Sequence, residues 1–149
     1  MAPTPPDRQT TDDPDEPRTE VELRLPAKGV YAAIVRTTAA GLAARLDFTI
    51  DDIEDLRIAI GEASALVIPR ADPDADLDCR FLLEPGSMTV ELSTAALDEP
   101  AADHDSFAWQ VLATLADDVS AGSSDGRFAA RFTVRSQVSA RTTGAERLT

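Results

Sequence analysis

The chain has 149 residues, of which 43% are hydrophobic, a size that fits one domain with a single core. Its 27 acidic and 14 basic residues give a formal net charge of -13. This charge argues against nucleic acid or an anionic membrane as the partner, because phosphate binding needs clustered Lys and Arg. It suits a basic protein partner, and it is also simply a way to stay soluble.

Neither a membrane span nor a secretory signal is expected. The longest apolar runs fall far short of the ~18 residues that suggest a membrane span. Residues 1–18 contain no apolar stretch of the kind found in a secretory signal. We therefore expect a cytoplasmic protein with no membrane partner.

Both ends of the chain differ in composition from its middle. Residues 1–19 are mostly Pro, Thr, Asp and Arg, and we expect a disordered tail because they offer almost no apolar surface to a core. The same argument applies to residues 136–149. One folded domain over residues 20–135 remains.

The folded part should begin with a strand and a helix. Val21, Leu23 and Leu25 alternate with polar residues and predict a half-buried strand, which Pro26 ends. From residue 28 to residue 46 the apolar residues recur with the period of a helix. The expected core stripe of this helix is Val30, Ile34, Thr38, Leu42 and Leu46.

A second helix should begin at Thr49, a good N-cap residue, and run to about residue 68, where Pro69 stops it. Asp51 and Asp52 lie in its first turn, where the helix dipole favours negative charge. Its expected core stripe is Ile53, Leu56, Ile60 and Val67.

After an acidic loop at residues 71–76, the pattern predicts a β-hairpin with its turn at residues 85–87, a third helix and a last strand. The core side of the hairpin should be Leu77, Cys79, Phe81, Leu83, Met88, Val90 and Leu92. Ser106 can cap the helix, with Phe107, Val111, Leu115 and Val119 at four-residue spacing. Residues 122–126 should turn into the strand, with Phe128, Ala130, Phe132 and Val134 facing inwards. A short turn between strands implies antiparallel pairing, so we predict an α+β fold with helices on one face of the sheet.

Few residues point to chemistry by themselves. Cys79 is the only cysteine, which excludes an internal disulfide and a Cys-rich metal site, and its alternating position indicates a buried core residue rather than a reactive thiol. His104 lies between two aspartates, so it is either a solvated loop residue or a metal ligand or base. Trp109 lies off the main stripe of its helix, and either core packing or a partner interface explains it. Glu62 lies among small apolar residues of the second helix, which is unusual for a carboxylate.

The chain resembles the anti-sigma factors of the RsbW type, most of all their actinobacterial branch. The resemblance covers nearly all of residues 20–135 and lies in the element order, in residues 56–63 (LRIAIGEA), and in residues 106–112 (SFAWQVL) with 115–119 (LADDV). It implies the Bergerat fold of histidine kinases and Hsp90-like ATPases, a two-layer sandwich with a mostly antiparallel sheet. Members of this family inhibit an alternative sigma factor, and active members are also serine kinases that act on an anti-anti-sigma antagonist.

Carried over by position, the nucleotide motifs of that family are eroded in this chain. The resemblance makes Glu62 the catalytic base, but Leu66 stands where the family has the asparagine that holds Mg²⁺. The adenine-reading Asp-x-Gly-x-Gly motif corresponds to residues 94–98, which begin with Thr94 and contain no glycine. The Gly-x-Gly motif that contacts phosphates corresponds to Ser106 and Ala108 at its two glycine positions. These five residues are the degenerate positions of the nucleotide cleft, and no metal ligand is assigned.

Two functions from different classes follow from the resemblance. The first is a binding protein that sequesters an alternative sigma factor in the stress response and is released by an anti-anti-sigma (STAS-domain) partner, without efficient use of ATP and with no bound cofactor. The family implies a homodimer for it, with the face around the first helix and a sheet edge at the interface. The second is an enzyme that binds ATP and Mg²⁺ weakly and phosphorylates the antagonist. The loss of three motifs favours the first, and a partner outside transcription is a third alternative.

Overall fold

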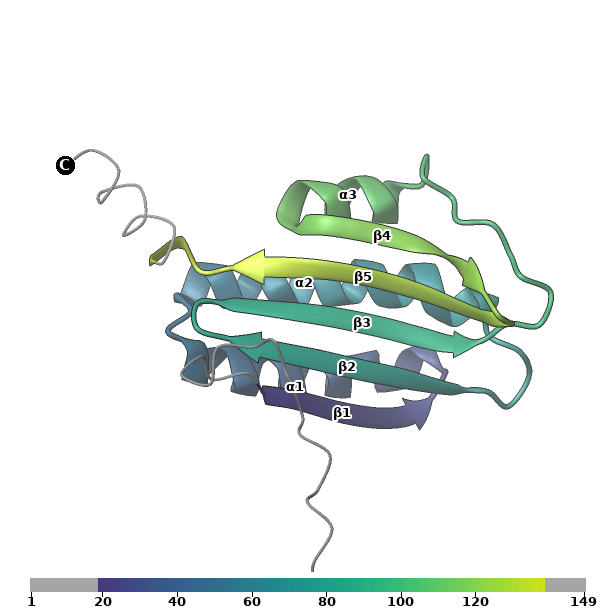
Figure 1. The fold of residues 1–149 in the computed structure, drawn as a ribbon, viewed down its shortest axis with the longest axis horizontal. Coiled ribbons are helices and arrows are strands. Elements are labelled where there is room, and N and C mark those ends of the chain that lie inside the picture. Colours follow the sequence, from purple (N-terminus) through teal and green to yellow (C-terminus); the bar gives the residue numbers. More distant parts are fainter. Residues whose placement is uncertain (1–18, 139–149) are drawn as a thin grey trace, which may run out of the picture.

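The computed structural model describes residues 19–138, which form one antiparallel sheet with a layer of helices on one of its faces (Figure 1). The strands are β1 (Thr19–Pro26), β2 (Asp76–Glu84), β3 (Ser87–Ala95), β4 (Asp117–Ser124) and β5 (Arg127–Arg135). The helices are α1 (Ala32–Ala43), α2 (Ile50–Val67) and α3 (Phe107–Leu115), with short 3-10 turns at 29–31, 44–46 and 68–70. The strand order is β1-β2-β3-β5-β4.

The central hairpin and β5 build the sheet side of the core, as the alternating pattern predicts. Along β2 and β3 every second residue is buried, and the residues between them are half-exposed or exposed. Successive side chains of a strand point to opposite faces of the sheet, which explains this alternation. Phe81 pairs with Val90, and Val90 pairs in turn with Phe132, so three buried side chains lie side by side across three strands. Burial of each such side chain stabilises the fold by about 2–3 kcal/mol. The predicted hairpin and last strand are confirmed.

Helix α2 begins with a capping box, which confirms Thr49 as its N-cap. The Thr49 hydroxyl accepts a hydrogen bond from the Asp52 amide at 3.1 Å, and the Asp52 carboxylate accepts one from the Thr49 amide at 2.8 Å. The buried Asp52 carboxylate also accepts from the Gln137 amide at 3.3 Å and from the Ser136 hydroxyl at 3.4 Å. The chain beyond β5 is thereby tied to the start of α2. The tails predicted at the two ends lie mostly outside the described residues.

The core stripe predicted for the first helix is confirmed at its end, where Leu42 and Leu46 pack against the core, and is wrong at its start. Val30 is 80% exposed and Ile34 is 45% exposed. The buried side chains of α1 are instead Ala32, Val35, Ala39 and Ala43. Alanine lets α1 lie close to α2 and the sheet, so small side chains face the core and larger ones are left outside. The stripe of α2 is confirmed, because Leu56, Ile60 and Val67 are buried and Ile53 is packed against the core.

The region after Ser106 differs most from the prediction. Helix α3 ends at Leu115, and Val119 belongs to β4, a strand that the pattern did not predict. Phe107 is 76% exposed, whereas Leu112 is the buried residue of α3. Strand β4 lacks alternation and is rich in Ser, Gly and Asp, so its conformation depends on pairing with β5 rather than on propensity.

Candidate functional site

Two of the residues carried over from the family lie one helical turn apart on α2. Glu62 is half-buried, and its carboxylate has no hydrogen bond or ion pair within residues 19–138. Leu66 is 3% exposed and belongs to the hydrophobic core. A core leucine offers no oxygen to a metal ion, and Mg²⁺ binds through oxygen ligands. The side chains at these two positions therefore do not fit a Mg²⁺-nucleotide site of the family's kind.

The other three carried-over positions have structural roles in this chain. The Ser106 hydroxyl accepts a hydrogen bond from the Trp109 amide at 3.2 Å and thus caps α3. Ala108 is half-buried and packs against the core. Thr94 is fully buried in β3, and its hydroxyl donates to the carbonyl oxygen of Asp76 at 2.9 Å. Each of these side chains is committed to the fold.

Helices α2 and α3 pack against each other, so Glu62 and Leu66 on α2 come from the helix next to Ala108 on α3 and to Ser106, the N-cap residue of α3. No hydrogen bond joins these four side chains among the residues that the structure describes. The contact buries Leu112 of α3 in the same core as Leu66. Within residues 19–138, no cluster of three or more His, Cys, Asp or Glu residues could hold a metal ion.

His104 and Trp109 lie edge to face, with their ring centroids 4.4 Å apart. His104 is exposed, and Trp109 is half-buried and packed against the core. The prediction that Trp109 packs against the core is therefore confirmed. A contact between Trp109 and a partner protein stays a prediction. Cys79 is buried, as predicted, and burial raises the pKa of its thiol to about 12, with a smaller contribution from the charge of Asp78.

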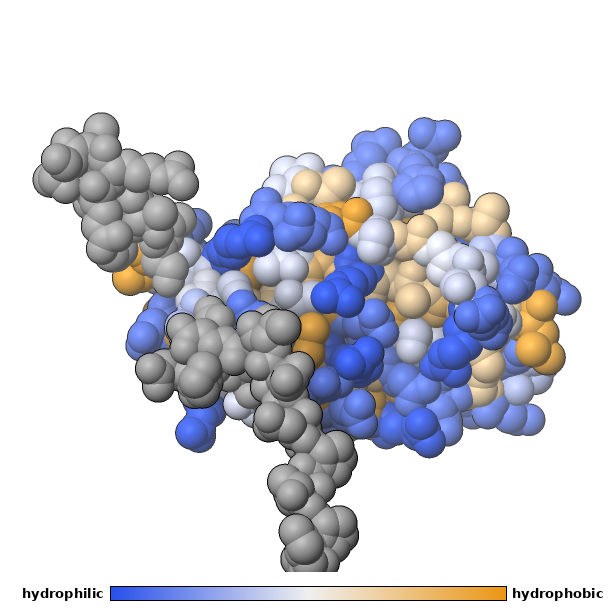
Figure 2. All heavy atoms as spheres, viewed as in Figure 1, coloured by the Kyte–Doolittle hydropathy of each residue, from blue (hydrophilic) through white to orange (hydrophobic). Residues whose placement is uncertain are grey.

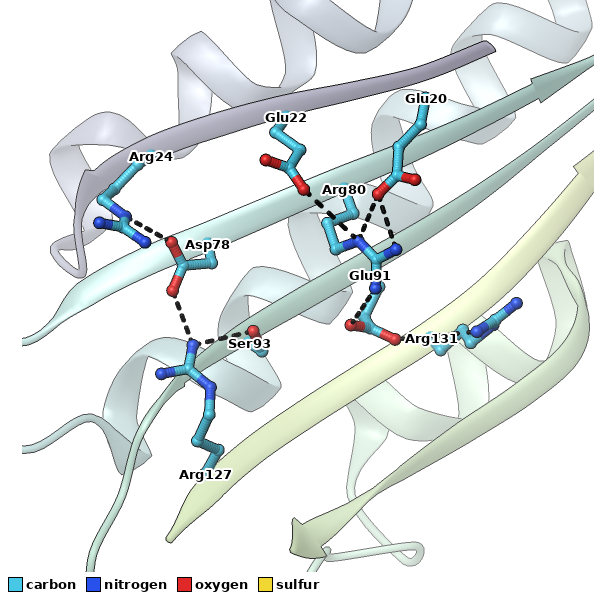
Figure 3. A network of polar contacts seen from close by, with 9 residues as sticks. All are labelled: Glu20, Glu22, Arg24, Asp78, Arg80, Glu91, Ser93, Arg127 and Arg131. Carbon is cyan, nitrogen blue, oxygen red and sulfur yellow. Dashed lines mark hydrogen bonds and ion pairs between the residues drawn. The ribbon is translucent and has the colours of Figure 1, made fainter. Parts of the chain in front are cut away.

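The outer face of the sheet carries a network of ion pairs across four strands (Figure 3). Arg24 and Arg127 both reach Asp78, each at 2.7 Å. On the same face, Arg80 contacts Glu20 at 2.6 Å, and hydrogen bonding to that carboxylate is the main cause of the raised pKa of Arg80. Exposed pairs of this kind contribute only about 0–1 kcal/mol each. Their effect is to keep this face polar, and Figure 2 shows hydrophilic residues over much of it.

Sequence reasoning did not find this network, although the signal was present. Charged residues recur at every second position of β1 and β2, as Glu20, Glu22 and Arg24 and as Asp78 and Arg80. Alternation at that spacing places them on one face of a sheet. Because the charges on this face satisfy one another, the exposed apolar side chains of the helix layer are better candidates for a partner contact.

Sequence comparisons find relatives for one segment of the chain. No protein-family model matches the chain. Proteins named serine-protein kinase RsbW from Bacillus thuringiensis (strain Al Hakam), Bacillus cereus (strain B4264) and Bacillus anthracis (strain A0248) are each 48% identical to it over 52 residues. That segment is 35% of this chain and 32% of each relative, so the chain spans about a third of the length of these curated relatives.

A solved structure with the RsbU and RsbW domains of Rv1364c from Mycobacterium tuberculosis superposes with a TM-score of 0.63 at 16% identity. The superposition covers 78% of this chain and 32% of the other. Over the 52 residues of the sequence match, the chain is similar to RsbW proteins. Its fold is the histidine kinase/Hsp90-like ATPase fold, with the mostly antiparallel sheet and one-sided helix layer that the resemblance implied. None of the helices within residues 19–138 is long and apolar enough to cross a membrane.

Proposed function

We propose that this RsbW-like chain is a cytoplasmic anti-sigma factor that sequesters an alternative sigma factor and acts without efficient use of ATP. An anti-anti-sigma protein with a STAS domain would release the sigma factor by competing for the chain, and the chain would act as a homodimer in a stress response. The support for the class of partner is the likeness to RsbW proteins in sequence and in fold.

The burial of Leu66 is the observation that carries the proposal of ATP independence. The resemblance assigns the family's metal-ligand position to Leu66, which is 3% exposed in the core. Replacing it with a polar ligand would place an amide in an apolar site, so a small change would not restore a working metal site. Ser106 and Thr94 are likewise engaged in hydrogen bonds within the protein. A partner switch that depends on competition alone needs none of these groups.

The second candidate is a serine-protein kinase with weak ATP binding. Two points favour it: the matched relatives are named serine-protein kinases, and the resemblance assigns the catalytic base to Glu62, whose carboxylate is free of partners within the described residues. A base alone does not position a phosphoryl group, which needs metal and phosphate contacts. We therefore rank the kinase second.

The test is a pull-down from the native host with the tagged full-length chain. The washes contain either EDTA with an ATP-depleting enzyme, or Mg²⁺ and ATP, and the bound proteins are identified by mass spectrometry. We expect a sigma factor, an anti-anti-sigma protein, or both, at equal yield under the two conditions. Recovery of neither by a folded bait would contradict the partner class, and recovery only with Mg²⁺ and ATP would favour the kinase.

A further inference from the structure

The connection between β3 and α3, residues 96–106, lies along one end of the sheet (Figure 1). These residues all lie in the described part of the chain and form no helix or strand of their own. They include Pro100 and no glycine, so the segment has less conformational freedom than a glycine-rich loop. By the resemblance, this segment joins the positions of the adenine-reading and phosphate-contacting motifs. We call it the β3–α3 strap.

Asp72 holds the beginning of the strap. Asp72 lies in the loop between α2 and β2, and both oxygens of its carboxylate accept a hydrogen bond from the Leu97 amide, at 3.1 and 3.2 Å. The backbone of the same residue is engaged as well, because the Asp72 amide donates to the Ala95 carbonyl at 2.9 Å. A hydrogen bond to an ionised carboxylate is stronger than one between neutral groups. The α2–β2 loop and the strap are thus joined through both side chain and backbone.

Glu99 holds the strap in the opposite direction, to the turn between β4 and β5. Its carboxylate accepts a hydrogen bond from the Gly126 amide at 3.2 Å, and the Gly126 carbonyl accepts one from the Ala96 amide at 2.8 Å. Glu99 has a φ angle of 48°, in the left-handed region. A residue other than glycine is uncommon there and persists where its surroundings hold it. The contacts with Gly126 provide that hold.

The second half of the strap contacts β4, the core and α3. The Ser123 hydroxyl of β4 donates to the Pro100 carbonyl at 2.5 Å, and Ala102 packs against the core. Near the end of the strap, the His104 ring meets Trp109 of α3 at a centroid distance of 4.4 Å. The position of the strap therefore determines where α3 begins.

We propose that the β3–α3 strap is closed in the absence of nucleotide and that Asp72 and Glu99 are the positioning residues that keep it closed. The inference rests on the proposed function, because it names the internal contacts that hold this part of the chain without ATP. Hydrogen bonds connect Asp72, residues 96–99 and Gly126, which are far apart in sequence. Loss of either carboxylate should therefore loosen the strap as a unit.

The first experiment measures amide hydrogen exchange of the full-length chain by NMR, first without nucleotide and then with Mg²⁺-ATP. We expect the amides of Leu97 and Gly126 to be protected without nucleotide and to change by less than about twofold when Mg²⁺-ATP is added. Exchange at the rate of an unstructured chain would overturn the proposal. Protection that increases at least about tenfold with Mg²⁺-ATP would also overturn it, because the strap would then close on the nucleotide.

Variants test the two carboxylates. Asp72→Ala and Glu99→Ala should each speed exchange at Leu97 and Gly126 at least about tenfold, because each removes a hydrogen bond to a charged group. Glu99→Gln keeps an oxygen acceptor in place and should retain most of the protection. Asp98→Ala, at the exposed position before Glu99, is the matched control and should change exchange little. Equal exchange in folded Glu99→Ala and Asp98→Ala variants would overturn the role of Glu99.

Trp109 gives a separate measure of whether the strap positions α3, because it is the only tryptophan of the chain. In the double variant Asp72→Ala with Glu99→Ala, loss of the His104 contact should raise the quenching of Trp109 fluorescence by acrylamide at least about twofold. Circular dichroism checks that the variant is folded. Quenching equal to that of the wild type in a folded double variant would overturn the link between the strap and α3.

The pull-down with and without Mg²⁺-ATP separates failure of the strap from failure of the proposed function. If the strap exchanges freely while the same regulatory protein is recovered equally under both conditions, the strap inference fails and the function stands. If Mg²⁺-ATP both closes the strap and raises recovery, the two fail together. If a folded bait recovers no regulatory protein while exchange is as expected, the function fails and the closed strap stands.

Discussion

Leu66 follows Glu62 by one helical turn on α2, yet Leu66 is 3% exposed in the core while Glu62 is half-buried with no partner for its carboxylate among the described residues. In the family that the chain resembles, the two positions belong to one catalytic motif. In this chain Leu66 belongs to the hydrophobic core, whereas the Glu62 carboxylate has no partner within residues 19–138. The two positions therefore respond differently to substitution.

Leu66→Asn should destabilise the chain without giving it a metal site. The substitution removes a buried leucine and places an amide in the core, which should lower the free energy of unfolding by about 3 kcal/mol. Urea unfolding followed by circular dichroism measures the loss, and calorimetry measures Mg²⁺-ATP binding. Ala65→Asn, one position earlier and exposed, is the control and should change stability little. A Leu66→Asn variant of wild-type stability that binds Mg²⁺-ATP would contradict this view of the site.

Glu62→Ala should leave partner binding essentially intact. The Glu62 carboxylate has no hydrogen bond or ion pair within the described residues, so its removal breaks no contact of the fold. The measurement is the yield of the bound regulatory protein in the pull-down, with Glu54→Ala at an exposed position of the same helix as the matched control. Loss of the partner in a correctly folded Glu62→Ala variant would show that this region takes part in binding.

Asp52→Ala should weaken the link between the start of α2 and the end of β5. The variant loses the capping box and the acceptor of the Thr49 and Gln137 amides, so we expect a loss of about 1–2 kcal/mol in stability. Chemical denaturation measures it. Asp51→Ala, next in sequence but exposed, should change stability by less than about 0.5 kcal/mol. Equal effects of the two substitutions would refute a specific role for Asp52.

The Cys79 thiol should be inert in the folded chain and reactive after unfolding. Burial raises its pKa from 9.0 to about 12, so hardly any thiolate forms in the folded state at about pH 8. Because the raised pKa favours the protonated form in the folded state, its contribution to stability is complete below pH 9.0 and is lost as the pH rises to about 12. Reaction with a thiol reagent, with and without concentrated urea, checks the reactivity. Rapid reaction of the folded chain would contradict the burial.

The elements that the sequence predicts best are those in which local pattern and tertiary contacts agree. The alternation in β2, β3 and β5 and the Thr49 cap of α2 survive in the structure because burial and hydrogen bonding favour the same conformation. The phase of α1 was missed because apolar residues of different size compete for the core, and the alanines Ala32, Ala39 and Ala43 allow the closer packing.

Strand β4 was missed because its own residues favour turns, yet a signal for it was present. Asp125 and Gly126 both have positive φ angles, 52° and 75°, as the central residues of a tight hairpin turn require. An Asp-Gly pair before the clear strand β5 predicts a partner strand on its other side. The helix prediction extended to Val119 instead, because the four-residue apolar spacing continues past Leu115, where α3 ends.

The candidate site was predictable only in part. The resemblance supplied the five cleft positions by number, but whether Leu66 lies in the core depends on how α2, α3 and the sheet pack together.

Binding of the purified chain to the purified sigma factor recovered in the pull-down, with no nucleotide, with Mg²⁺-ADP and with Mg²⁺-ATP, tests the central claim most directly. Isothermal titration calorimetry gives the dissociation constant in each case. We predict the same constant within about a factor of two in all three, because the Leu66 position cannot ligate the metal of a nucleotide complex. A complex at least about tenfold tighter with Mg²⁺-ATP would show that the nucleotide site still operates and would contradict the account.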